Sequence, residues 1–96
     1  MGAEARPLSR NISEIADAIY ADYREQKKAI YFGAEPYIDA MTALDTMDLS
    51  TPYGAEDAYT IIAYALSNLT YWRGDTAKSI KAELKSALVD YRLRSR

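Results

Sequence analysis

The clearest helical signal in the chain is the stretch Gly74-Asp75-Thr76-Ala77-Lys78-Ser79-Ile80-Lys81-Ala82-Glu83-Leu84. Gly74 interrupts the preceding segment, and the short polar residues after it are typical of a helix start. Apolar residues then recur at spacings of three and four as far as Tyr91, which places them on one face of a helix. The pattern predicts a helix over residues 75–92 whose apolar face packs on a core.

Two helices are predicted near the start of the chain. The first covers residues 11–29, where Asn11 and Glu14 have the spacing of a capping box. The second covers residues 35–45 and begins beside Pro36, a residue suited to a first helical turn because its missing N–H is not needed there. Both stretches carry apolar residues at helical spacing.

A third helix is predicted over residues 55–69, the most apolar stretch of the four. We place Glu56 and Asp57 in its first turn, where the helix dipole favours negative charge. Four helices with short connections predict an all-α fold, a compact bundle or array in a single domain. A homodimer that buries further apolar surface stays open as an alternative.

The segments between and beyond the predicted helices are expected to form a leader, a corner, a loop and a tail. Residues 1–8 read as a polar leader without the apolar segment of a secretory signal, and residues 93–96 are expected to fray. The apolar run Ile30-Tyr31-Phe32-Gly33 is expected to form a corner packed under the bundle. Residues 46–54 contain Ser, Pro, Asp and Gly, which is typical of a loop.

Composition narrows the function classes. The 96 residues include no cysteine and no histidine, so thiol chemistry, disulfides, the commonest metal ligand and the commonest general base are all missing. We therefore expect a protein that is not an enzyme and holds no cofactor or metal. No apolar run approaches the roughly 20 residues of a membrane span, so we expect no membrane association and a cytoplasmic location in a host cell.

Charge is unevenly distributed along the chain. Residues 29–72 carry six acidic and no basic side chains, whereas residues 73–96 carry seven basic and three acidic ones. In one interpretation the two segments face each other, across the fold or between subunits. In the other, the last helix binds an anion through Lys78, Lys81, Lys85 and Arg92. A sequence pI of about 5.0 counts against nucleic acid.

Tyrosine is unusually abundant, with nine Tyr against one Phe and one Trp. Tyrosine has an apolar ring and a polar tip and is enriched at protein interfaces. The candidate protein-binding residues are Tyr31, Tyr37, Tyr53, Tyr71, Trp72 and Arg73. For the last two an alternative stays open, in which Trp72 fills the junction between the last two helices and Arg73 pairs with Asp57 or Asp75.

Four carboxylates near the middle of the chain, Asp45, Asp48, Glu56 and Asp57, raise the question of a metal site. Their spacing does not match a calcium-binding loop, which needs ligands at alternate positions, a central glycine and a final glutamate. We interpret them as helix caps and loop charges.

Two separated strings carry a resemblance to a known group. These are Tyr31-Phe32-Gly33-Ala34-Glu35-Pro36-Tyr37-Ile38-Asp39-Ala40-Met41 and Trp72-Arg73-Gly74-Asp75-Thr76-Ala77. They resemble segments of small accessory proteins of actinobacteriophages, including mycobacteriophages, over about residues 30–88. The resemblance implies a viral protein without an assigned activity, which acts by binding a host protein, and it implies no catalytic residues.

These observations favour a non-catalytic phage accessory protein that works through a protein–protein interaction. Two alternatives remain at this stage. One is a nucleic-acid-binding regulator that uses the basic last helix, whose affinity would fall steeply with salt. The other is a structural component of a virion that assembles with copies of itself.

Overall fold

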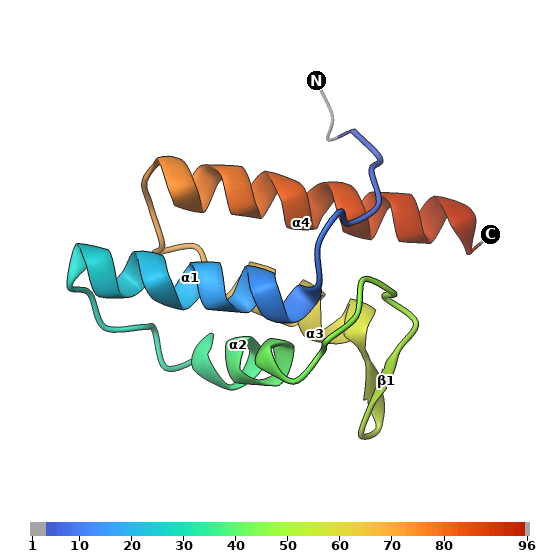
Figure 1. Cartoon of the computed structure of the whole chain (residues 1–96), viewed down its shortest axis with the longest axis horizontal. Coiled ribbons are helices and arrows are strands. Elements are labelled where there is room, and N and C mark those ends of the chain that lie inside the picture. Colours follow the sequence, from blue (N-terminus) through green and yellow to red (C-terminus); the bar gives the residue numbers. More distant parts are fainter. Residues whose placement is uncertain (1–3, 96) are drawn as a thin grey trace.

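The computed structural model describes residues 4–95, which form four helices and one short hairpin (Figure 1). The helices are α1 (Ile12–Gln26), α2 (Glu35–Thr42), α3 (Ala58–Ser67) and α4 (Asp75–Arg94), and the strands are β1 (Pro52–Tyr53) and β2 (Glu56–Asp57). The predicted all-α fold of four helices is confirmed. Met1–Ala3 and Arg96, parts of the predicted leader and tail, lie outside the described residues.

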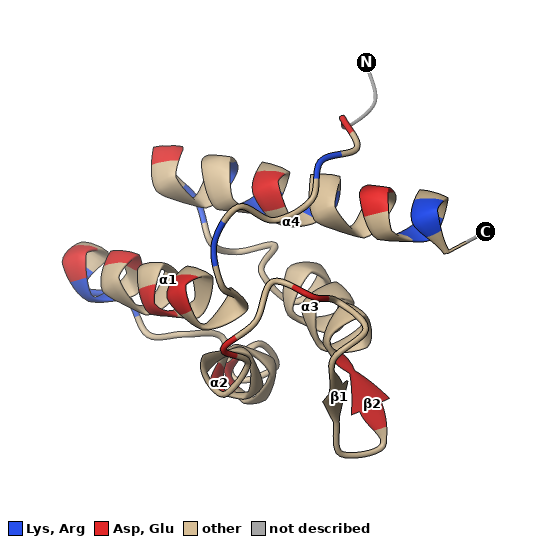
Figure 2. Cartoon of the chain, turned by 45° about the vertical axis from the view of Figure 1, so that its right-hand side comes forward, with Lys and Arg blue, Asp and Glu red and all other residues tan. Residues whose placement is uncertain are grey.

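The helices pack in layers around one core. α1 and α3 each pack against both α2 and α4, and α4 lies on one side of them while α2 lies on the other (Figures 1 and 2). The apolar faces predicted from helical spacing point inward, and the buried side chains form one cluster. The largest of the fully buried side chains is Trp72.

Three helices end earlier than their apolar patterns predict, and α3 stops at Ser67 instead of residue 69. α1 stops at Gln26 instead of residue 29, because Lys27 adopts a left-handed conformation, with φ of 55° and ψ of 40°. The amide of Lys28 then donates to the carbonyl of Tyr23, which closes the helix with the hydrogen bond of a Schellman motif. α2 stops at Thr42 instead of residue 45.

The segment after α2 leaves the helix because its backbone is used elsewhere. The carbonyls of Leu44 and Thr46 accept hydrogen bonds from the amides of Ser13 and Ile12, each at 2.9 Å. These amides belong to the first turn of α1 and have no acceptor within their own helix. Residues 43–46 therefore do not extend α2. Two of their carbonyls instead accept the hydrogen bonds that fix the start of α1.

The hairpin is a correction to the predicted third helix. Glu56 and Asp57 are not in the first turn of α3 but form β2, with Tyr53 opposite Glu56. Gly54 has a φ of 61°, a conformation that glycine adopts without strain and that lets the chain reverse between the strands. α3 begins at Ala58, and Asp57 is its N-cap, because its carboxylate accepts from the amide of Thr60 at 2.9 Å.

The corner predicted for residues 30–33 is partly wrong. Ile30 packs against the core and a turn follows it, but Phe32 is 80% exposed. The amide of Ala34, a buried residue directly after this segment, donates to the carbonyl of Tyr31 at 2.9 Å. Periodicity could not show that Phe32 is left outside the core.

The predicted polar leader packs on the fold over its described part. Leu8 is buried, and the amide of Arg6 donates to the carbonyl of Ser86 in α4. At the other end, α4 continues through Arg94, so residues 93 and 94, predicted to fray, are helical. Leu8 joins the core because the chain runs across α4 before it enters α1 (Figure 1).

Candidate functional site

Three aromatic side chains gather on the surface where the connection between α1 and α2 passes the end of α3. The Tyr31 ring lies between Phe32 and Tyr71, with centroid distances of 4.9 Å and 5.6 Å. Phe32 is 80% exposed and Tyr71 is 68% exposed. A single exposed ring needs no explanation, but two exposed rings that both contact Tyr31 form an apolar surface that the core does not use.

The Tyr31 ring is held in place from beneath. A Cβ atom on Gly33 would lie 2.6 Å from Cε2 of Tyr31 and 3.0 Å from Oδ1 of Asn68, so the ring occupies the space that a larger residue would fill. Asn68 donates from Nδ2 to the carbonyl of Tyr64 at 2.9 Å. These contacts fix Tyr31 against the end of α3.

A second pair of rings extends the surface along α3. Tyr37 of α2 and Tyr64 of α3 have centroids 5.3 Å apart, and Tyr64 is exposed. Asn68 follows Tyr64 by four positions at the end of α3, and Asn68 and Tyr31 both border the Cβ position of Gly33, so the pair lies close to the three rings. We refer to Tyr31, Phe32, Tyr37, Tyr64 and Tyr71 as the aromatic strip.

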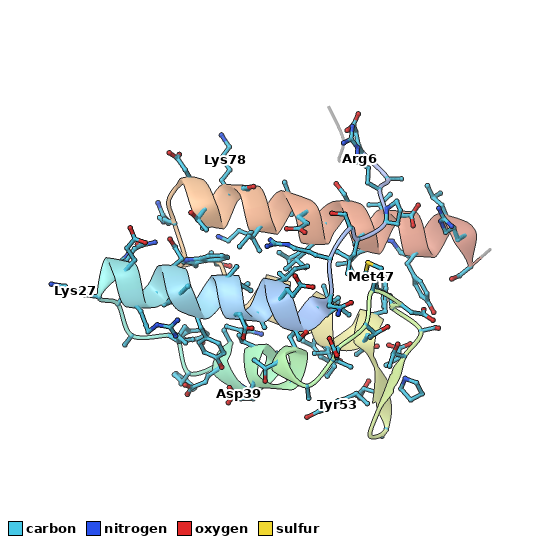
Figure 3. The ribbon with its side chains drawn as sticks, viewed as in Figure 1. Arg6, Lys27, Asp39, Met47, Tyr53 and Lys78 are labelled. Atoms are coloured by element: carbon cyan, nitrogen blue, oxygen red, sulfur yellow. The ribbon has the colours of Figure 1, made fainter. Side chains whose placement is uncertain are left out.

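The structure brings together part of the predicted set and adds to it. Tyr31, Tyr37 and Tyr71 belong to the strip, and sequence reasoning missed Phe32 and Tyr64. Tyr64 could have been found, because it lies off the apolar stripe of a helix that is otherwise nearly all apolar. Tyr53 lies on the hairpin (Figure 3), and no ring contact joins it to the strip among the described residues.

Trp72 is a core residue and offers no surface to a partner. Its side chain is fully buried, its ring stacks on Tyr23 at 5.7 Å, and its Nε1 donates to the carboxylate of Asp22 at 2.7 Å. The carbonyl of Trp72 also accepts from Nζ of Lys81. Trp72 therefore joins the connection between α3 and α4 to α1. The alternative interpretation placed it at the junction of the last two helices, whereas its ring stacking and its side-chain hydrogen bond are with α1.

Arg73 is exposed, as a binding residue should be. The predicted ion pair with Asp57 or Asp75 is not among those that the described residues form. The backbone of Arg73 is fixed, because its carbonyl accepts from Nε2 of Gln26 at 3.0 Å. The guanidinium group stays free on an anchored backbone.

The candidate anion-binding residues of α4 divide into two kinds. Lys78, Lys85 and Arg92 follow at intervals of seven, so they lie along one face, and all three are exposed. Lys81 is half-buried, and its ammonium group donates to the carbonyl of Trp72. Burial, helped by the positive charges of Arg73 and Lys85, lowers the pKa of Lys81.

The acidic middle segment does not pair with α4. In the described part of the chain the ion pairs are Arg6–Glu4, Arg10–Glu83 and Arg94–Asp90, and none joins residues 29–72 to residues 73–94. α2 and α4 lie on opposite sides of the molecule (Figure 2), which keeps the carboxylates of α2 away from α4. Lys78, Lys85 and Arg92 are exposed.

Three of the four central carboxylates act as caps and loop acceptors. Asp45 accepts from Nδ2 of Asn11 at 2.6 Å, and Asp57 caps α3. Asp48 accepts from the amide and the hydroxyl of Ser50, and these two bonds lower the pKa of Asp48. This is the structural role that their spacing indicated.

Known proteins give no further guide. No protein-family model, curated protein or solved structure matches the chain. Within residues 4–95 no helix combines the length and the apolar character needed to cross a membrane.

Proposed function

We propose that this chain is a non-catalytic protein that acts by binding another protein through the aromatic strip. One observation carries the proposal, namely that large rings lie exposed and in contact with one another on a single surface. Aromatic side chains supply much of the energy at protein interfaces, because they bury a large area at a small cost in conformational entropy.

The strip is also ordered before any partner arrives. Tyr31 is held by Phe32, Tyr71 and the surface of Gly33, and Tyr37 by Tyr64. A ring that is already fixed loses less rotational freedom on binding, so more of the contact energy appears as affinity. This arrangement favours a binding surface over rings left outside for lack of room in the core.

The resemblance of residues 30–88 to small actinobacteriophage proteins supports a further part of the proposal. In this proposal the chain is a phage accessory protein and its partner is a protein of the bacterial host. Four of the five strip residues, Tyr31, Phe32, Tyr37 and Tyr71, lie in or directly beside the two strings that carry the resemblance.

The test is a capture experiment in an actinobacterial lysate with the tagged chain as bait. The bait is compared with the double variant Phe32→Ser/Tyr71→Ser, and nuclease and high salt are included. We expect the wild-type bait to capture a defined host protein and the double variant to lose it. The two substitutions remove the exposed rings of Phe32 and Tyr71, which are not part of the core.

Leu93→Ser is the matched control, because Leu93 is 54% exposed and lies on α4 outside the strip. This variant should retain the partner. Equal capture by the double variant, or recovery that disappears with nuclease, would contradict the proposal.

A nucleic-acid-binding role is the second candidate. It is favoured by the exposed face of Lys78, Lys85 and Arg92, which make no ion pair among the described residues. The double variant Lys78→Glu/Lys85→Glu should then abolish binding to DNA, and wild-type affinity should fall steeply with salt. Unchanged DNA binding in this variant would exclude the basic face of α4 as the binding site, and absence of DNA binding by the wild type would exclude the second candidate.

A further inference from the structure

One end of the aromatic strip lies beside the positively charged end of the molecule. Gln26, in the last turn of α1, donates to the carbonyl of Arg73 at 3.0 Å, and Lys81 of α4 donates to the carbonyl of Trp72. The segment that carries Tyr71 is therefore fixed between the end of α1 and the first half of α4. Lys27 and Lys78 mark these two helix ends, which lie at the same end of the molecule (Figure 3).

Lys81 at this end donates to the carbonyl of Trp72, but the cations here are not neutralised by ion pairs within the described residues. Residues 22–35 and 71–85 contain seven Lys and Arg residues: Arg24, Lys27, Lys28, Arg73, Lys78, Lys81 and Lys85. None of them is in an ion pair within the part of the chain that the structure describes. By contrast, Arg6, Arg10 and Arg94 elsewhere are each paired with a carboxylate.

Fewer carboxylates remain free at this end. The same two segments contain five Asp and Glu residues, but Glu83 is paired with Arg10, which lies outside them. Asp22, Glu25, Glu35 and Asp75 are left against seven cations. The local balance is therefore positive in a chain whose net charge is −2, and a partner placed here meets cations that form no ion pair within the described residues.

We propose that Phe32, Tyr71 and the neighbouring free cations form one surface that binds an acidic segment of a partner protein. An apolar or aromatic side chain of that segment packs on the two rings. Its carboxylates lie against Lys28 and Arg73, where charge complementarity guides association and orients the partner. This inference rests on the proposed protein-binding function and adds the chemistry of the partner.

A nucleic acid fits this surface less well. The three rings meet at 54° and 66°, so they cover one another's faces and edges and do not present the successive open faces on which bases stack. Residues 43–57, at the opposite end of the molecule (Figure 1), carry four acidic residues and no Lys or Arg. A long polyanion that extended along the chain would be repelled there.

The test uses the purified chain labelled with ¹⁵N and three synthetic probes, with backbone amide shifts as the readout. The probes are a glutamate-rich peptide with one Phe and one Trp, the same peptide with Lys in place of each Glu, and oligothymidylate. We expect the acidic peptide to shift the amides of Phe32, Gly33, Tyr71 and Arg73, and its Kd to rise with ionic strength.

Matched variants separate the charges from the rings. Arg73→Glu should weaken the acidic peptide about tenfold, which corresponds to about 1.4 kcal/mol, whereas Arg92→Glu makes the same change in net charge at a distance and should leave the Kd unchanged. Phe32→Ser should abolish binding, and Leu93→Ser should not.

Three results would overturn the inference. If the Lys-containing peptide binds as tightly as the acidic one, the strip still binds protein, so the proposed function stands and the acidic partner is wrong. Tighter binding of oligothymidylate would make this a nucleic-acid surface. Absence of binding by all three probes would show that the rings and the cations do not act together as one surface. The lysate experiment tests the protein-binding function of the strip separately.

Discussion

Lys27 shows how a single backbone angle ends a helix. Its left-handed conformation, with φ of 55°, costs a residue with a Cβ about 1 kcal/mol relative to glycine. The cost is offset by the hydrogen bonds that Lys27 and Lys28 donate to the last turn of α1. A glycine would keep these bonds without the steric penalty.

Replacing Lys27 with glycine is therefore expected to stabilise the protein. Lys27→Gly should raise the free energy of unfolding by about 0.5–1 kcal/mol, measured by urea denaturation. Lys28→Gly removes the same charge one residue later and should be neutral or slightly destabilising, because it only adds freedom to the unfolded chain. Equal effects of the two variants would show that backbone strain is not the cause.

Tyr20 makes the protein sensitive to alkaline pH. Its hydroxyl donates to the carboxylate of Asp39, and burial, followed by this bond and the negative charge of Asp39, raises the pKa of Tyr20 from its usual value of 10.0. A group whose pKa is higher in the folded state stabilises that state at pH below the unfolded value. The contribution is lost as pH rises through the folded pKa.

We therefore expect the free energy of unfolding to fall as the pH is raised above about 10. Tyr20→Phe should show a smaller fall over the same range, and near neutral pH it should be less stable than the wild type by about 1 kcal/mol for the lost hydrogen bond. Urea denaturation at a series of pH values measures both effects. Tyr53→Phe, on the exposed hairpin, is the control, and its free energy of unfolding should depend on pH as in the wild type. If Tyr20→Phe also shows the wild-type dependence, the prediction is wrong.

The side chains of residues 31–33 mark the limit of prediction at this scale. Composition showed that tyrosine was in excess, and three candidates, Tyr31, Tyr37 and Tyr71, do lie on the strip. The direction of Phe32 could not be read from a four-residue run without a period. It depends on the turn closed between Ala34 and Tyr31 and on the absence of a Cβ at Gly33.

At the scale of elements, one connection organises the starts of two helices. Carbonyls of Leu44 and Thr46 accept from the first amides of α1, and those of Leu49 and Thr51 accept from the amides of Tyr59 and Ala58 in α3. Each bond satisfies a donor that a helix cannot satisfy itself. The loop of residues 43–51 thus fixes the starts of α1 and α3 at one end of the bundle.

Asp57 completes this arrangement, since its carboxylate caps the third residue of α3 through the amide of Thr60. Asp57→Ala should lower the free energy of unfolding by about 1 kcal/mol, as for other N-cap losses. Glu56→Ala, one residue earlier on the same strand and fully on the surface, is the control and should change stability by less than about 0.5 kcal/mol. If the control costs as much as Asp57→Ala, the effect comes from charge and not from the cap.

Helix existence was predictable in this chain, whereas several helix boundaries were not. Apolar spacing identified all four helices, and the starts near Pro36 and Gly74 agree with the structure. Two of the shifted boundaries, the end of α2 and the start of α3, lie where backbone groups bond to distant segments, whereas α1 ends at the left-handed Lys27. The hairpin could not be predicted from alternating polar and apolar residues, because its strands have only two residues each. Its reversal depends on the positive φ of Gly54.

At the scale of the whole molecule, the sequence showed how charge is distributed along the chain, but it could not show which of the charged side chains are paired. The two interpretations of the basic last helix differ in whether its cations are paired. That depends on contacts such as the one between Arg10 and Glu83, which are 73 positions apart in the chain. The structure pairs Arg10 and leaves Lys78 and Lys85 free, so the positive surface follows from the packing of the chain start on α4.

That packing makes the N-terminal segment part of the fold. Leu8 is buried, and Arg10 holds Glu83 with two hydrogen bonds, of 3.0 and 2.7 Å. The segment thereby ties the start of α1 to the middle of α4. Leu8→Ala should then lower the free energy of unfolding by about 2 kcal/mol through the loss of buried apolar volume.

Leu93→Ala is the matched control in the same denaturation experiment, because it makes the same change at a position that is 54% exposed. It should cost less than about 0.5 kcal/mol. A segment that merely trailed from the domain would give two small and similar values. A large effect confined to Leu8 would show that the segment before α1 is part of the core that holds α1 and α4 together.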